Sequence, residues 1–149
     1  MVTYQYVPFT YIMVAQAGYS EASLVKKLGI KAGYKIRLVD PPEHYFDLLG
    51  VFPADIEFFG ESSERLDFIH YFTKQAADLV RDLASLKAEI VPSGMIWISW
   101  PKKASKVPTD VTEDVIRNLA LSIGLVDVKV CAVDAVWSGL KLVIRVKDR

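Results

Sequence analysis

The segment WPKKASKVPTDVTED (residues 100–114) joins an expected strand to an expected helix and concentrates charged side chains. Its three lysines are Lys102, Lys103 and Lys106. The free amide groups at the start of the following helix favour anions, so a phosphate or a carboxylate could dock beside these lysines. Three acids at the same helix start, Asp110, Glu113 and Asp114, stabilise a first helical turn and neutralise the lysines. We favour a charge-balanced connection and keep an anion site at Lys102 and Lys103 as the alternative.

The candidates for proton transfer are His70 and Asp40, and His44 is the candidate for metal binding. His70 lies inside an expected strand and would titrate near neutral pH if its imidazole faced a cavity, whereas a core position would leave it inert. Asp40 ends the first expected strand, where side chains project toward a ligand, although Asp before two prolines also begins a turn. His44 stands beside Glu43 and Asp47, but a metal needs further ligands at matched geometry, so we expect no metal.

Three tryptophans and one cysteine complete the candidate residues. Trp97, Trp100 and Trp137 could stack on a planar ligand, although tryptophan beside strands usually fills the core or a subunit contact. Trp137 is the one that we expect in a turn, within Trp137-Ser138-Gly139. Cys131 lies in an apolar strand and is expected to pack. The sequence contains no P-loop, G-x-S-x-G, Cys-x-x-Cys or dinucleotide-binding fingerprint.

Composition limits the class of protein. The 149 residues suit one domain, and 52% hydrophobic with 24% charged residues suits a packed core. Eighteen basic and eighteen acidic side chains cancel, which disfavours nucleic acid and anionic membrane surfaces as partners. A single cysteine cannot form an internal disulfide, so we expect a cytoplasmic protein.

The first seventeen residues, MVTYQYVPFTYIMVAQA, form an apolar and aromatic arm. No Lys or Arg precedes Lys26, so the positive region of a secretory signal is missing. Pro8, Thr10 and Gln16 interrupt the run, which is too short to span a bilayer. We expect residues 1–17 to add a strand or to pack against a second copy in a homodimer, and residues 18–149 to form one domain.

Hydrophobic periodicity predicts alternating strands and helices. The expected strands are residues 34–40, 54–60, 65–72, 95–100, 127–133 and 140–146, and the expected helices are a short one capped by Ser20 and ended by Gly29, a single turn at 44–50, and two longer ones at 73–91 and 110–123. The longest helix has apolar residues at helical spacing, among them Val80 and Ile90, and Pro92-Ser93-Gly94 stops it. Asp110 and Glu113 have the spacing of a capping box at the start of the last helix.

This order of elements predicts an α/β fold. We expect a three-layer, Rossmann-like sandwich with a mainly parallel sheet of about six strands and an antiparallel C-terminal hairpin, because strand-helix-strand units cross over right-handedly. Ligands of such sheets bind beyond the carboxyl ends of the strands. That rule nominates the loops at 40–45 and 100–108 and the connection after Phe72.

Several segments are similar to an uncharacterised bacterial family, the DUF3052 proteins. The likeness runs from about Gly18 to Val146 and rests on LVKKLGIKAGYKIRLVDPP, on the WPKK and TDVTE segments and on GLVDVKVCAVDAVWSGLK. The last segment is the most specific of these. The family has no established activity, so the resemblance suggests a family for the chain but implies no mechanism.

The chain also resembles S-adenosylmethionine-dependent methyltransferases, more distantly. LGIKAGYKIRLVD looks like the lead into the first strand of that fold, and the C-terminal hairpin looks like its end. The glycine-rich loop that would approach the cofactor is replaced by PPEHYFDLLG, and its two prolines remove two amide donors. Glu57 is the nearby acid for the ribose, but it sits inside a strand. The resemblance thus implies a truncated methyltransferase topology whose cofactor site is lost.

We therefore expect a non-catalytic protein that binds an unidentified small molecule or protein partner, without a cofactor. The alternative is a divergent methyltransferase that uses S-adenosylmethionine, or a nucleotide-binding transferase; fold analogy alone supports either. We predict no catalytic residue. The predicted ligand-binding residues are Asp40, Pro41, His70, Trp100, Lys102, Lys103 and Trp137.

Overall fold

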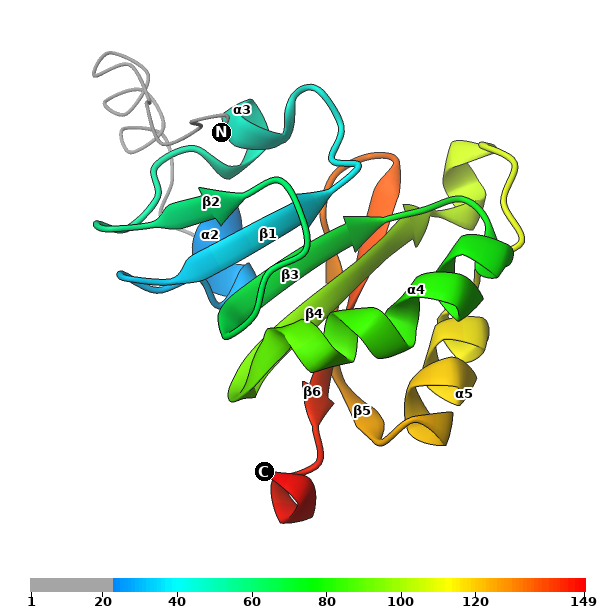
Figure 1. Cartoon of the computed structure of the whole chain (residues 1–149). Coiled ribbons are helices and arrows are strands. Elements are labelled where there is room, and N and C mark those ends of the chain that lie inside the picture. The colour runs from blue at the N-terminus through cyan, green and yellow to red at the C-terminus, as the bar shows by residue number, and fades with distance from the viewer. Residues whose placement is uncertain (1–22) are drawn as a thin grey trace.

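The computed structural model of the chain describes residues 23–149 and contains one six-stranded sheet (Figure 1). The strands are β1 (Lys35–Val39), β2 (Glu57–Phe59), β3 (Leu66–Phe72), β4 (Ile90–Pro101), β5 (Leu125–Ala132) and β6 (Trp137–Ile144). Their order across the sheet is β2-β1-β3-β4-β6-β5. β1 to β4 are parallel, and β6 runs antiparallel to both β4 and β5. The predicted α/β fold with an antiparallel C-terminal pair is confirmed.

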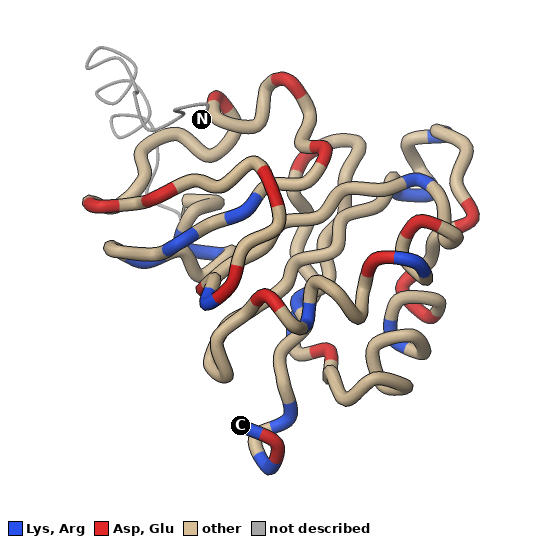
Figure 2. The backbone as a smooth tube through the Cα atoms, in the orientation of Figure 1, with Lys and Arg blue, Asp and Glu red and all other residues tan. Residues whose placement is uncertain are grey.

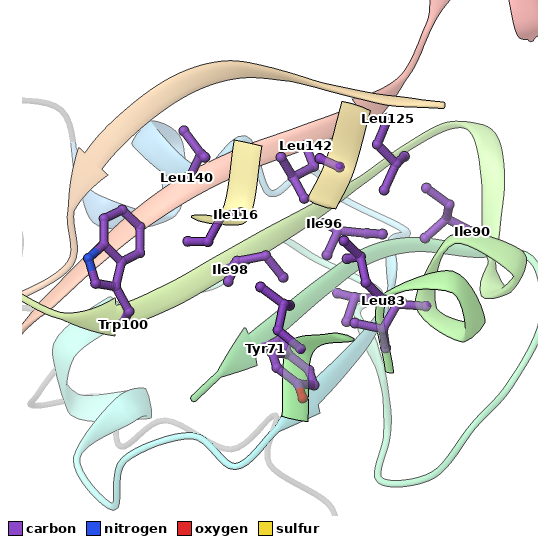
Figure 3. Packing of buried hydrophobic residues seen from close by; sticks show 14 of the residues in the cluster. Tyr71, Leu83, Ile90, Ile96, Ile98, Trp100, Ile116, Leu125, Leu140 and Leu142 are labelled. Atoms are coloured by element: carbon purple, nitrogen blue, oxygen red, sulfur yellow. The ribbon is translucent and has the colours of Figure 1, made fainter. Parts of the chain in front are cut away.

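Helices cover both faces of the sheet. They are α2 (Leu24–Leu28), α3 (Tyr45–Leu49), α4 (Ala76–Glu89) and α5 (Glu113–Ser122), with single 3-10 turns η1 (Lys103–Ser105) and η2 (Val146–Asp148). α4 and α5 pack their apolar stripes on one face, and this first cluster includes Leu83, Ile98 and Ile116 (Figure 3). The single-turn helices α2 and α3 pack on the other face, in a second cluster that includes Leu28 and Tyr45.

Alternation along the strands divides side chains between the two clusters. In β3, Ile69 and Tyr71 face α4, whereas Phe68 and Phe72 face α3, as the period of two predicts. In β4, Ile96, Ile98 and Trp100 belong to the first cluster, and Met95 and Trp97 belong to the second. Both faces of the central strands are apolar because helices cover both faces.

Two predicted helix caps are wrong. Ser20 lies outside the described residues, and Ser23 caps α2 by accepting a hydrogen bond from Lys26 N at 3.3 Å. Thr112, and not Asp110, caps α5 by accepting from Val115 N at 3.1 Å. Asp110 instead accepts from Ala76 N at 2.7 Å, so it caps the neighbouring helix α4.

Three further local expectations differ from the structure. Val80, predicted on the buried stripe of α4, is 62% exposed, and Ile90 begins β4 instead of ending the helix. Trp137-Ser138-Gly139 is not a turn, because these residues are the first three of β6. The turn lies earlier, where Asp134 Oδ1 accepts hydrogen bonds from the amides of Val136 and Trp137.

Within residues 23–149, no helix has the length and apolar character needed to span a bilayer. The arm of residues 1–17 lies outside the described part of the chain, so its expected role in a homodimer stays a prediction.

Candidate binding site at the carboxyl ends of β1 and β3

The strand order reverses between β1 and β3. β1 pairs with β2 on one side and with β3 on the other, and later strands continue away from β3. In open α/β sheets this reversal is where ligands bind, outside the carboxyl ends of the strands. Here those ends are Val39 and Phe72. The segment after Val39 turns into α3, which packs on the second cluster.

The side chain of Tyr45, at the start of α3, fills the space beside the end of β3. Tyr45 is 1% exposed, and its ring stands edge-on to Phe72, with 5.7 Å between ring centroids. Its hydroxyl oxygen lies 2.9 Å from His70 Nδ1 and shares a hydrogen bond with it. Burial raises the pKa of the Tyr45 hydroxyl, so this group stays protonated.

His70 is enclosed between two hydroxyl groups. Its Nδ1 faces Tyr45, its Nε2 lies 2.8 Å from Ser99 Oγ, and its ring stacks on Phe72 at 4.2 Å between centroids. His70 is 0% exposed, and burial lowers the pKa of its imidazole to about 3. A neutral imidazole has one N–H donor and one acceptor nitrogen, which two hydroxyl groups can satisfy. His70 is therefore neutral at physiological pH and forms part of a buried polar chain.

Trp137 also packs against Phe72. Its ring meets Phe72 edge-on at 5.1 Å between centroids, and its amide donates to Asp134 Oδ1 at 2.7 Å. The second oxygen of Asp134 lies 2.8 Å from His44 Nε2. The segment after β1 is thus tied to the β5–β6 turn across the end of β3. His44 pairs with Asp134 here, and no group of three potential metal ligands occurs among residues 23–149.

The backbone around α3 holds this arrangement in place. Asp40 is exposed and has φ of 52°, a left-handed conformation that Asp tolerates better than most residues. Pro41 and Pro42 follow it half-buried and offer no N–H. Gly50 closes the segment with φ of 76° and ψ of −127°, which a side chain would strain.

The structure brings only some of the predicted ligand-binding residues together. His70 and Trp137 both contact Phe72, and the amide of Lys102 donates to the carbonyl oxygen of Val136, the residue before Trp137, at 2.7 Å. Trp100 lies on the opposite face of the sheet in the first cluster. Lys103 is exposed in η1. No finding tests ligand binding at these residues, so that role stays a prediction.

The acids expected to balance Lys102, Lys103 and Lys106 contact other groups. Asp110 caps α4, whereas Glu113 and Asp114 both bind Arg117. Within residues 23–149, none of the three lysines forms an ion pair. The connection is therefore held by caps and turns and not by balanced charges.

Sequence reasoning missed three residues that build the site: Tyr45, Ser99 and Asp134. The Tyr45–His70–Ser99 chain joins residues 25 and 29 positions apart, and no local pattern announces such a contact. Asp134 did carry a signal, because Asp often bonds the backbone two residues ahead to form a turn.

Among the solved structures with a similar fold are proteins that are named as methyltransferases. A putative type 11 methyltransferase from Sulfolobus solfataricus matches with a TM-score of 0.58 and 13% identity, over 81% of this chain and 89% of its own. The PH0226 protein from Pyrococcus horikoshii matches with a TM-score of 0.56 and 11% identity, over 82% and 86%. A SAM-dependent methyltransferase from Aquifex aeolicus matches with a TM-score of 0.55 and 17% identity, over 79% and 86%. Identities this low show the fold alone.

No protein-family model matches the chain, and no curated protein does. The methyltransferase-like fold is thus shown, whereas membership of the DUF3052 family stays a prediction.

Proposed function

We propose that the chain is a binding protein that keeps the sheet of a methyltransferase but does not transfer methyl groups. The observation that supports this proposal is the position of Tyr45. Its buried ring packs beside the end of β3, where a ligand of this fold would lie, and His70 holds its hydroxyl group.

A cofactor at this place would need both space and backbone donors. Pro41 and Pro42 supply no N–H groups where the chain leaves β1. Moving Tyr45 away would expose a fully buried aromatic side chain, which costs roughly 2 kcal/mol. It would also break a hydrogen bond worth about 1 kcal/mol. A total of about 3 kcal/mol lowers an apparent affinity by roughly two orders of magnitude.

The second candidate is a divergent methyltransferase, or a nucleotide-binding transferase. The similarity of the fold to proteins named as methyltransferases supports it. In this case α3 would swing outward about Asp40 and Gly50, which both have positive φ, and Tyr45 would leave His70. Asp40 and Lys102 would then border the opened space.

Thermal unfolding with added ligands separates the two candidates. The full chain is heated with S-adenosylmethionine, S-adenosylhomocysteine or a nucleotide at millimolar concentration. A ligand at about 100 times its Kd stabilises the native state by about 2.7 kcal/mol, which raises Tm by about 5 °C or more for a domain of this size. We expect no such rise, and a rise with the S-adenosyl compounds would support the methyltransferase.

A Tyr45→Phe variant serves as the matched control in this test. Phe keeps the ring that fills the space and removes only the hydroxyl bond to His70. We expect this variant to remain without a ligand-induced rise in Tm. A rise in the variant but not in the unmodified chain would mean that the hydroxyl bond alone closes a working site, which would contradict the proposal.

A further inference from the structure

Three lysines from separate elements gather beside the end of α2, and we call them the lysine cluster: Lys31, Lys129 and Lys141. Lys129 and Lys141 are direct cross-strand partners in the antiparallel β5–β6 pair. Like charges directly opposite each other on neighbouring strands are destabilising. Lys31 stands in the connection from α2 to β1. A chain whose total charge is zero has therefore placed three positive charges together.

The end of α2 stands over Lys141. A Cβ atom built on Gly29 would lie 3.9 Å from Lys141 Nζ, and Lys129 Nζ donates to Lys27 O at 3.0 Å. Burial lowers the pKa of the Lys141 ammonium group, and repulsion from Lys129 and Lys31 lowers it further. Lys129 and Lys31 are thus both close enough to repel the ammonium group of Lys141.

Capping of α2 does not account for Lys141. The last four carbonyl groups of the helix already accept hydrogen bonds: Val25 O from Ile30 N, Lys26 O from Gly29 N, Lys27 O from Lys129 Nζ and Leu28 O from Trp97 Nε1. A lysine near a helix C-terminus ordinarily serves those carbonyl groups. Each of these four carbonyl groups has a donor other than Lys141, so Lys141 does not cap α2.

Among residues 23–149, no carboxylate forms an ion pair with the lysine cluster. Across residues 23–149, the ion pairs involve other side chains, and none includes Lys31, Lys129 or Lys141. The sequence of residues 1–22 contains one acidic side chain, Glu21, which is fewer than the three lysines need. In Figure 2, blue segments mark the basic residues of α2 and β1.

We propose that the lysine cluster binds a small phosphorylated ligand through its phosphate groups. Each lysine ammonium group is a point charge with three donors, which suits phosphate oxygens. A ligand with two or more phosphate groups carries enough negative charge to relieve the repulsion between Lys129 and Lys141. The net charge of the chain is zero, so the chain lacks the overall positive charge that favours binding of a long polyanion. This site does not depend on whether the space beside Tyr45 admits a ligand.

Calorimetric titration with inorganic pyrophosphate tests the proposal. The full chain, a Lys141→Gln variant and a Lys147→Gln variant are titrated at one low, fixed ionic strength. Lys147 is an exposed lysine in η2 and is the matched control. We expect saturable one-to-one binding that Lys141→Gln weakens by about tenfold or more, because a charge-assisted contact is lost, and that Lys147→Gln changes by less than about twofold. Absence of saturable binding, or equal losses in both variants, would overturn the proposal.

Two further arms separate a small-ligand site from a structural role of Lys141 and from binding of a polyanion or a membrane. Without pyrophosphate, Lys141→Gln should unfold at the same temperature as the unmodified chain or higher, because it removes a repulsion. A clearly lower Tm would show that Lys141 is a structural residue and would overturn the proposal.

Single-stranded DNA and vesicles containing phosphatidylserine are titrated in parallel. Binding to either that is tighter than to pyrophosphate, and lost in Lys141→Gln, would overturn the assignment to a small ligand.

Discussion

Lowering the pH from 7 to 5 should destabilise the protein through His70. Burial holds the pKa of this imidazole at about 3 in the folded chain, against an ordinary value near 6.5 when the chain unfolds. Because the pKa of His70 is lower in the folded chain, its contribution to the free energy of unfolding is complete above pH 6.5. It is lost as the pH falls from 6.5 toward 3, because only the unfolded chain then takes up the proton.

The pKa difference sets the size of the effect. At pH 5 the solution is about 1.5 pH units below the pKa of the unfolded imidazole. Protonation of the unfolded chain then lowers the free energy of unfolding by about 2 kcal/mol. The full loss, reached near pH 3, is about 5 kcal/mol. Since stabilities of small domains are about 5–15 kcal/mol, a loss of about 2 kcal/mol is readily measured.

Urea unfolding at pH 7 and pH 5 measures this loss. His70→Gln keeps hydrogen-bonding groups between Tyr45 and Ser99 but cannot titrate, so its fall in stability should be smaller than that of the unmodified chain by about 2 kcal/mol. The His44→Gln variant lacks the exposed histidine beside Asp134. Its free energy of unfolding should still fall between pH 7 and pH 5 by most of the amount seen in the unmodified chain. An equally steep fall in His70→Gln and in the unmodified chain would refute the buried, neutral state of His70.

Three other changes have defined outcomes. Tyr45→Phe should lower the free energy of unfolding by about 1–3 kcal/mol in urea, since the buried nitrogen of His70 loses its partner; an unchanged value would contradict the hydrogen bond. Glu89→Gln should cost about 3 kcal/mol, because Arg37 Nη1 lies 2.7 Å from the Glu89 carboxylate and both side chains are largely buried; a loss below about 1 kcal/mol would show that solvent screens the pair. If residues 1–17 join two copies, sedimentation should show a smaller particle for a chain beginning at Met13 than for the full chain, and equal sizes would dismiss that role.

The sequence predicted the layers of the fold because local periodicity carries that information. The alternation of Phe68, His70 and Phe72 placed these side chains on one face of β3, where the structure has them. Helical spacing similarly located α4 and α5. Apart from Val80, which lies within α4, the exceptions were at element ends, where tertiary contacts decide. Asp110 caps α4 because Thr109 Oγ1 donates to Lys74 O and brings the two loops together.

The site could be predicted only in part. The strand-end rule named the loop at 40–45 and the connection after Phe72, and both border the place that Tyr45 fills. Whether Tyr45 fills this place depends on how α3 packs against the end of β3. No residue pattern in PPEHYFDLLG predicts that packing. The lysine cluster was missed for the same reason, because Lys129 and Lys141 become neighbours only through the register of β5 and β6.

The account depends most on the space beside the ends of β1 and β3 being closed to a cofactor. Titration of the isotopically labelled chain with S-adenosylhomocysteine, followed by NMR at the amides of Asp40, Tyr45 and Phe72, tests this directly. We predict that these resonances stay in place up to millimolar ligand. Saturable shifts at all three amides would show that α3 opens and would contradict the account.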